Sequence, residues 1–382
     1  MSSNTLIALK EAGQSPWLDN LSRDLIESGK LKRMVDEQGL CGVTSNPSIF
    51  QQALAGSKAY DRALEDLLNK GLRDTRQLFF ALALEDIAAA ADILLPVYNN
   101  SGGNDGFLSL EVSPDLAYDT DATIEEALRL FQSLARKNVM IKVPATLPGL
   151  SAIESLIAAG VNINVTLLFS VSRYQQVMEA YLKGLEQRLE QGKSIKDIAS
   201  VASFFVSRVD VMIDALLKQK IGAAAGEEKK NQLAELFGQA AVANARLANQ
   251  AFEQIFQGRR FKELEKHGAR IQRLLWGSTS TKNPDYSDIK YVQELIGPNT
   301  VNTMPEETML AFADHGEVKE TIRQDVDKAD KLFTDLKRLD IDINVVTDRL
   351  EKEGVDKFSK SFTDLLGGIA DKRDRLLQTR AE

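Results

Sequence analysis

The sequence predicts an α/β protein folded as a closed (β/α)8 barrel, and three observations support this prediction. Short apolar segments alternate with longer helical ones, and eight such alternations favour a closed parallel barrel over an open sheet. Within the strand-like segments, polar side chains gather on one face. The chain has 382 residues, of which 43% are hydrophobic, and this suits one large barrel core with additional helices.

The eight candidate strands are the short apolar segments. They cover residues 16–21, 42–47, 107–113, 139–145, 161–169, 199–207, 274–281 and 300–305. The candidate helices lie between them and include residues 22–39, 123–137, 172–192 and 229–256. A strand followed by a helix, repeated eight times, is the unit from which a parallel barrel closes.

Two parts of the chain are additional to the eight strand–helix units. Residues 51–106 contain more helix and the turn sequence "NNSGGNDG", which predicts a helical insertion between the second and third strands. The stretch from about 306 to 382 is helical and rich in charge, so we expect C-terminal helices whose charges face solvent. No low-complexity linker divides the chain, so we expect residues 1–382 to form a single barrel domain.

Composition narrows the possible functions. A formal net charge of −8 disfavours a nucleic-acid binder, and no run of about 18 apolar residues predicts a membrane span. The single cysteine, Cys41, excludes an internal disulfide and suits a reducing compartment. The start "MSSNTLIALKEAGQS" has no secretory pattern, so we expect a cytoplasmic protein. The two histidines, His267 and His315, lack metal-ligand spacing, so we expect no bound metal.

The polar sets of the strands are the main functional signal. Alternate side chains share a face, and in the fifth strand Ile163, Val165 and Leu167 form the apolar one. The polar sets are Thr44 and Asn46; Ser109, Glu111 and Ser113; Asn162, Asn164 and Thr166; and Ser278, Ser280 and Lys282 if the seventh strand reaches its predicted end. The outer face must be apolar to bind helices, so we expect these groups to point inward near the carboxyl ends of the strands. The alternative is a hydrogen-bonded polar core without catalysis.

Lys142 lies inside the apolar run of the fourth candidate strand. Burying an ammonium group without a partner is costly, and a desolvated lysine is partly neutral near pH 7. Such an amine can attack a carbonyl carbon and form a Schiff base, which then acts as an electron sink for breaking an adjacent C–C bond. The residue therefore predicts covalent catalysis without a metal.

Proton transfer still requires acids and bases, and no histidine lies in a suitable place. Glu111 and Asp19 are the available carboxylates. Asn46, Asn164 and Thr166 could position hydroxyl groups and a water. Arg208 and Lys282 follow the sixth and seventh strands, where barrels often bind phosphate, although both could instead be surface charges.

Six stretches of the sequence form a specific combination, and they are "GVTSNPSIF", "LEVSPDLAYDT", "IKVPAT", "NINVTLLFS", "SFFVSRVD" and "NTMPEETM". Together they resemble the transaldolases of the pentose phosphate pathway, and the resemblance covers nearly the whole chain. The length and the C-terminal extension resemble the longer bacterial and plant-type branch. The resemblance implies a TIM barrel of the class I aldolase type and a carbohydrate-metabolising transferase that needs no cofactor or metal.

The same resemblance implies a role for each matching residue. Lys142 is the Schiff-base nucleophile, Asp19 moves the proton of the C4 hydroxyl, and Glu111 with Thr166 holds the catalytic water. The remaining positions bind substrate: Thr44, Asn46, Asn164 and Ser203 at the three-carbon unit, and Arg208 and Ser280 at the phosphate. Compact members of the family have an arginine where this chain has Lys282, which keeps the charge but lacks the bidentate fork.

Phe205 bears on the choice between two activities. The related fructose-6-phosphate aldolases carry a tyrosine at this position, so phenylalanine favours transfer to an aldose over simple release. Core packing is the other interpretation of this ring.

The resemblance implies a defined reaction. A dihydroxyacetone unit moves from sedoheptulose 7-phosphate to glyceraldehyde 3-phosphate, which gives erythrose 4-phosphate and fructose 6-phosphate. The alternatives are a fructose-6-phosphate aldolase and a catalytically silent sugar-phosphate-binding barrel. The expected partners are small sugar phosphates, with no nucleic acid or membrane, and the chain is expected to be a monomer or homodimer.

Overall fold

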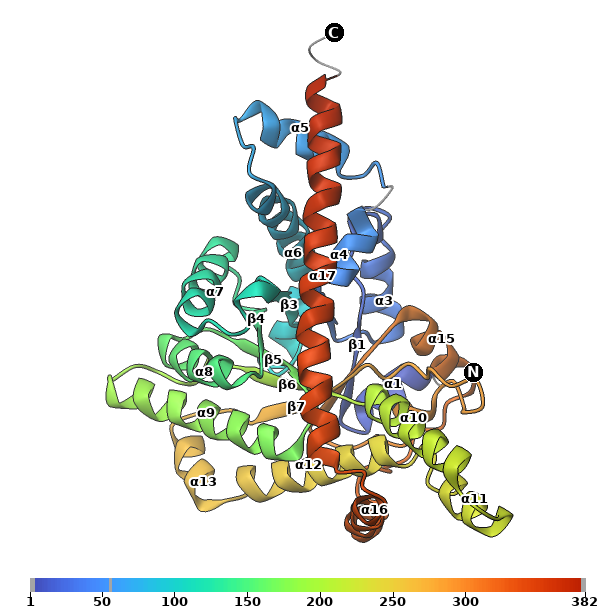
Figure 1. Ribbon diagram of the computed structural model, residues 1–382. Helices are drawn as coiled ribbons and strands as arrows, with labels where there is room; N and C mark the ends of the chain where they lie inside the picture. The colour runs from blue at the N-terminus through green and yellow to red at the C-terminus, as the bar shows by residue number, and fades with distance from the viewer. Residues whose placement is uncertain (1–3, 55–56, 379–382) are drawn as a thin grey trace.

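The barrel predicted from the sequence is present. The computed structural model describes residues 4–54 and 57–378, and eight parallel strands close in sequence order from β1 to β8 (Figure 1). The strands are β1 (Gln14–Leu18), β2 (Gly42–Thr44), β3 (Leu108–Glu111), β4 (Val139–Pro144), β5 (Ile163–Leu168), β6 (Ser200–Phe205), β7 (Gln272–Gly277) and β8 (Thr300–Met304). Each one overlaps its predicted segment, so the fold class and strand order are confirmed.

Helices surround the barrel and extend it at two places. Those up to β7 are α1 (Thr5–Glu11), α2 (Arg23–Glu27), α3 (Lys30–Gln38), α4 (Pro47–Leu54), α5 (Asp61–Asn69), α6 (Thr75–Asn100), the 3-10 turn η1 (Pro114–Leu116), α7 (Thr120–Leu134), α8 (Leu147–Ala159), α9 (Val171–Glu190), α10 (Ser207–Ala223), α11 (Glu227–Ala234), α12 (Ala240–Phe256) and α13 (Arg259–Lys266). Those after it are α14 (Lys290–Gln293), α15 (Glu306–His315), α16 (Val326–Arg338) and α17 (Ile343–Gln378). Among the described residues, none of these helices is long and apolar enough to cross a membrane.

Polar residues at the ends of strands start the helices that follow. Thr146 after β4 accepts a hydrogen bond from the Gly149 backbone N–H, and Ser170 after β5 accepts one from Arg173. A side-chain oxygen at this position satisfies a backbone donor that has no partner within the helix. Each strand end is thereby fixed where the barrel opens.

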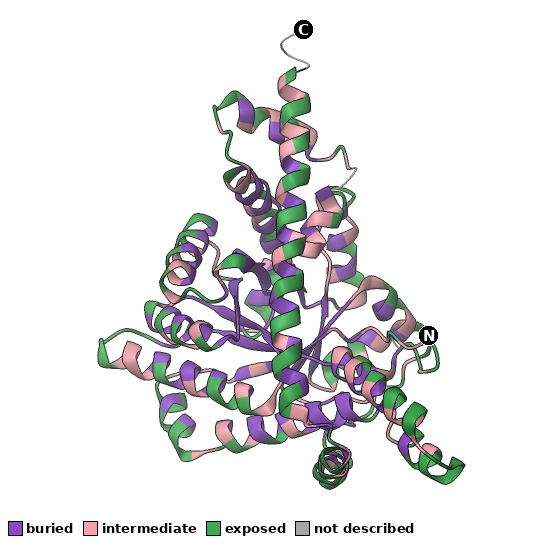
Figure 2. Ribbon diagram, viewed as in Figure 1, coloured by how far each residue is buried: buried purple, intermediate pink, exposed green. Residues whose placement is uncertain are grey.

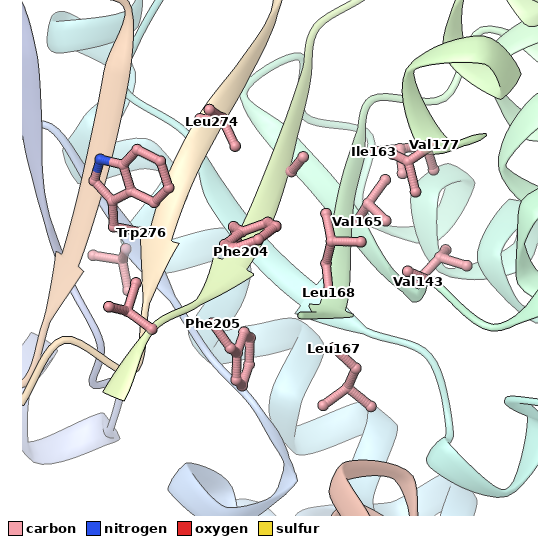
Figure 3. Packing of buried hydrophobic residues seen from close by; sticks show 14 of the residues in the cluster. Val143, Ile163, Val165, Leu167, Leu168, Val177, Phe204, Phe205, Leu274 and Trp276 are labelled. Carbon is pink, nitrogen blue, oxygen red and sulfur yellow. The ribbon is translucent and has the colours of Figure 1, made fainter. Parts of the chain in front are cut away.

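Apolar side chains form two separate layers. The outer layer lies between the strands and helices, where Val165, Phe204 and Trp276 lie on neighbouring strands and Val177 of α9 lies beside Ile163 (Figure 3). A second cluster from the strands includes Met140 and Val201, which lie two residues before the polar positions Lys142 and Ser203. Polar groups therefore follow apolar ones inside the barrel, toward the carboxyl ends of the strands, as the alternation predicts.

Every strand ends before its predicted last residue, so Asp19 and Asn46, which were predicted on strands, lie just after β1 and β2. The seventh strand ends at Gly277, because Ser278 adopts a left-handed backbone conformation with φ of 53°. Ser280 and Lys282 therefore lie in a loop and not on a strand face. At Leu167 the backbone φ is 56°, and the register between β5 and β6 shifts between Val165 and Leu168. This irregularity takes Leu167 out of the predicted outer face and places it against α17.

Helix α17 crosses the end of the barrel where the strands finish (Figure 1). It packs on α10 and β5 at one side and on α4 and α6 at the other. Phe362 contacts Phe79 of α6 at a ring-centroid distance of 5.5 Å, and Glu351 pairs with Arg173 at 3.3 Å. The outward face of the helix is largely exposed, while residues such as Phe358 are buried beneath it (Figure 2). The C-terminal extension therefore covers the barrel mouth.

Candidate active site

Lys142 and Glu111 face each other inside the barrel. The strand register aligns Glu111 of β3 with Lys142 of β4, and Lys142 with Asn164 of β5. Lys142 Nζ lies 3.6 Å from Glu111 Oε2 and donates a hydrogen bond to the Ser45 carbonyl oxygen at 3.4 Å. Lys142 is the only buried lysine in the described part of the chain. Glu111 is therefore the charged partner of Lys142, a pairing that the sequence alone did not identify.

Burial dominates the chemistry of Glu111. It raises the pKa of this carboxyl to about 7, and the Lys142 charge opposes that rise without cancelling it. Both Glu111 carboxyl oxygens and the Thr166 hydroxyl are buried, and no described group forms a hydrogen bond with them. A carboxyl with this pKa can give and take a proton near neutral pH, and the hydroxyl offers a second polar contact for a water.

Asp19 lies directly after β1 and is held by β2. Its Oδ1 accepts a hydrogen bond of 2.8 Å from Thr44 Oγ1, which lies 2.6 Å from Thr303 Oγ1. Burial raises the pKa of Asp19, while Lys142, the Thr44 hydrogen bond, Lys282 and Arg208 act against the rise. The charges of three other predicted site residues, Lys142, Lys282 and Arg208, therefore reach this carboxyl.

A chain of hydrogen bonds fixes the amide beside Lys142. Ser203 Oγ donates to Asn164 Oδ1 at 2.7 Å, and Asn164 Nδ2 donates to Ser109 Oγ at 2.9 Å. All three side chains are buried. Asn46 lies outside this chain of hydrogen bonds. Its Oδ1 accepts a hydrogen bond from the Ile49 N–H and so caps α4.

Cationic groups lie on the β6–β7 side. Arg208, in the first turn of α10, has its guanidinium 5.3 Å from the Phe205 ring centre, and Phe205 contacts Phe169 at 5.2 Å. Phe205 thus packs between an aromatic ring and Arg208. Lys282 is exposed in the loop after β7 and donates a 2.6 Å hydrogen bond to Ser280 Oγ. The structure brings the predicted acid, base, nucleophile and cations to one end of the barrel.

A larger cavity lies elsewhere. Its volume is about 830 Å³, and it opens beside the beginnings of the strands, where Ser15 and Arg273 line it. Its central carboxylate, Asp105, already accepts hydrogen bonds from Ser15 and from Trp17 Nε1 and lies 3.6 Å from Arg273. By contrast, the cavity lined by Asn46 and Glu111 measures only about 10 Å³. Catalysis in such barrels occurs at the carboxyl ends of the strands, so chemistry and not size identifies the site.

Sequence reasoning missed three contributors to this site. Ser45 supplies a carbonyl oxygen to Lys142, Ser109 accepts from Asn164, and Thr303 contacts Thr44. The polar face of the third strand did include Ser109, but without a function. Thr303 shares the inward face of β8 with apolar Val301 and alternates with Met304 of the outer layer, and this pattern is the only signal that could have indicated it.

A (β/α)8 barrel with a buried lysine–carboxylate pair at the strand ends defines a class of enzymes that can form a Schiff base with a carbonyl substrate. Residues 16–369 match the family model described as transaldolase/fructose-6-phosphate aldolase, and the chain belongs to this family.

Named relatives cover almost the entire chain. A protein named Transaldolase 2 from Nostoc sp. (strain PCC 7120) is 48% identical over 375 residues, or 97% of this chain and 98% of its own. A transaldolase from Trichodesmium erythraeum is 46% identical over 378 residues, or 98% and 99%. One from Mycolicibacterium smegmatis is 48% identical over 362 residues, or 94% and 95%. These matches confirm the resemblance found in the sequence.

Proposed function

We propose that this protein is a transaldolase that moves a dihydroxyacetone unit from sedoheptulose 7-phosphate to glyceraldehyde 3-phosphate, giving erythrose 4-phosphate and fructose 6-phosphate. The observation that carries the proposal is the buried Lys142–Glu111 pair, 3.6 Å apart, in a chain whose relatives are named transaldolase. The single cysteine suits a reducing compartment, and we place the enzyme in the cytoplasm as a monomer or homodimer.

The covalent step starts at Lys142. Its amine nitrogen attacks the C2 carbonyl carbon of the donor, and the carbonyl oxygen leaves as water when the iminium forms. Glu111, whose pKa burial raises to about 7, donates the proton that this departing oxygen needs. Later the carboxylate accepts a proton from the water that hydrolyses the iminium, and Thr166 holds this water in place.

Carbon–carbon cleavage then uses Asp19. Its carboxylate takes the proton of the C4 hydroxyl, the C4 oxygen becomes an aldehyde, and the electron pair of the C3–C4 bond moves into the iminium. Erythrose 4-phosphate leaves, and the enamine remains on Lys142. Attack of the enamine on the aldehyde carbon of glyceraldehyde 3-phosphate forms the new bond, and Asp19 returns its proton to the new hydroxyl. No cofactor is required.

The other site residues bind and orient the substrate. The hydrogen-bonded Asn164 and Ser203 contact the three-carbon unit together with Thr44 and Asn46. Arg208, Ser280 and Lys282 bind the phosphate, and Phe205 orients the Arg208 guanidinium by packing against it.

Reductive trapping tests the proposal. The enzyme is incubated with fructose 6-phosphate, reduced with borohydride and mapped by mass spectrometry, and the adduct is expected on Lys142. An adduct on another lysine would overturn the role of Lys142, and no adduct at all would favour a silent sugar-phosphate-binding barrel. A second assay omits the aldose acceptor, because rapid release of dihydroxyacetone would identify a fructose-6-phosphate aldolase instead.

A further inference from the structure

One face of α17 lies directly over the cationic side of the barrel mouth. At Gly354 the helix approaches so closely that a Cβ atom would lie 2.9 Å from Leu167 and 3.8 Å from Arg208 Nη1. Seven residues later, Ser361 Oγ accepts a hydrogen bond of 2.8 Å from Ser48 Oγ at the start of α4. Residues three, four and seven apart share a helix face, so the turn between these two contacts also faces the mouth.

Lys357 occupies this turn beside buried Phe358, and like Lys352 it is an exposed residue. The charge of Arg208 lowers the pKa of Lys357 most, followed by burial and by the charge of Lys282. No described carboxylate forms an ion pair with Lys357, whereas Glu351, earlier on the same helix, is paired with Arg173. Three cations, from α10, the loop after β7 and α17, therefore lie close enough for their charges to repel one another.

A group of like charges is unfavourable unless an anion joins it. The dianionic phosphate of a sugar phosphate would attract all three cations. Two of these three groups, Arg208 and Lys282, also act on the pKa of Asp19, so the cationic group adjoins the proton-transfer end of the site. Asp19 and these cations therefore lie close enough for their charges to interact.

We propose that Lys357 is a third phosphate-binding residue, supplied by the C-terminal helix as it covers the barrel mouth. The proposal rests on the transaldolase function and specifies its substrates as phosphorylated sugars. It also explains why a lysine, Lys282, can stand where compact members of the family have an arginine. A lysine lacks the bidentate fork of arginine, but a second ammonium group from α17 would add to its binding of phosphate.

Charge variants of Lys357 test this inference, with Lys352 as the matched control. Lys352 is exposed on the same helix, but its position is about 200° around the helix from that of Gly354. The variants Lys357→Ala, Lys357→Glu and Lys357→Arg are compared with Lys352→Ala and Lys352→Glu. For each, kcat and KM are measured with fructose 6-phosphate as donor, together with inhibition by inorganic phosphate and the melting temperature.

We expect Lys357→Ala to raise KM for fructose 6-phosphate by about threefold to tenfold, and Lys357→Glu to raise it by more than about tenfold. Inhibition by inorganic phosphate should weaken in parallel, kcat should change little, and Lys357→Arg should restore binding. Borohydride trapping with unphosphorylated fructose should remain at the wild-type level. The Lys352 variants should resemble the wild type.

Equal KM values in Lys357→Glu and Lys352→Glu would overturn the role of Lys357. An equal loss for fructose and fructose 6-phosphate would do the same, because the residue would then shape α17 without binding phosphate. Failure of the proposed function is a separate result. In that case the wild type itself would form no adduct at Lys142 with either sugar.

Discussion

Replacing Glu111 by glutamine tests the electrostatics of the barrel interior. In the folded protein, burial raises the pKa of Glu111 from 4.5 to about 7 although Lys142 lies nearby. In the unfolded chain this carboxyl is exposed and returns to its ordinary value. The interval between the two values corresponds to about 3 kcal/mol in the free energy of unfolding.

The direction of the effect depends on where the proton is held. Between pH 4.5 and about 7, the folded protein keeps a proton on Glu111 that the unfolded chain has lost, so stability falls as pH rises. Below this range the group is protonated in both states, and above it the group is ionised in both. Glutamine does not titrate, so the Glu111→Gln variant does not lose stability in this way as the pH rises. Its free energy of unfolding relative to the wild type should therefore increase by about 3 kcal/mol across the range.

Urea titrations followed by far-UV circular dichroism, at a series of pH values, measure this difference. The amide group also changes the free energy of unfolding by an amount that is the same at every pH. The test is therefore how the difference between variant and wild type changes with pH. Glu228→Gln, at an exposed position on α11, is the control and should run parallel to the wild type. If the Glu111→Gln difference is also flat, or falls with pH, then Glu111 is not the desolvated carboxyl that the structure shows.

Four further substitutions examine other parts of the site. Lys142→Ala should abolish the borohydride adduct because no other described lysine is buried, and mass spectrometry of the reduced protein checks this. Arg208→Ala should weaken the binding of phosphorylated donors by about 1.5–3 kcal/mol more than that of unphosphorylated ones. An equal rise in KM for both kinds of donor would show that Arg208 does not bind the phosphate. Phe205→Tyr should raise the ratio of fructose 6-phosphate cleavage to transfer, by less than the roughly 10²-fold that an optimised proton donor provides. A folded variant with an unchanged ratio would make Phe205 a packing residue. Gly354→Leu should push α17 away from Leu167, which lowers the melting temperature and raises KM for sugar phosphates, and a variant with wild-type values would show that the helix does not dock so closely.

The strands could be predicted because the physics that forms them is local. A parallel barrel needs an apolar outer face on every strand, and the alternation of Ile163 and Val165 with Asn164 shows that face directly in the sequence. The row of Glu111, Lys142 and Asn164 follows from strand order once the barrel closes. The hydrogen bonds within the row depend on register, which the sequence of a single strand does not determine.

Two irregular backbone positions that the prediction missed have a different cause. Leu167 and Ser278 both adopt positive φ, a conformation that usually requires glycine, asparagine or aspartate. Neither leucine nor serine is a residue type that predicts this backbone conformation. The surrounding structure stabilises it instead: Ser278 accepts a hydrogen bond from the Ser207 N–H, and Leu167 packs under α17. Tertiary contacts of this kind have no counterpart in a local sequence pattern.

The placement of α17 shows most clearly what a single sequence cannot reveal. A glycine within a helix costs about 1 kcal/mol relative to alanine, so each glycine in α17 requires a reason. Gly354 has one, because any side chain there would meet Leu167, whereas a Cβ atom added at Gly367 or Gly368 would have no neighbour within 4 Å. The sequence does not distinguish these three residues. In the same way Lys357 and Lys352 are both lysines on a charge-rich helix, and only the docking of Gly354 turns the first toward Arg208. Because this docking depends on an irregular residue of β5, the phosphate-binding role of Lys357 is a property of the folded barrel mouth and not of the helix alone.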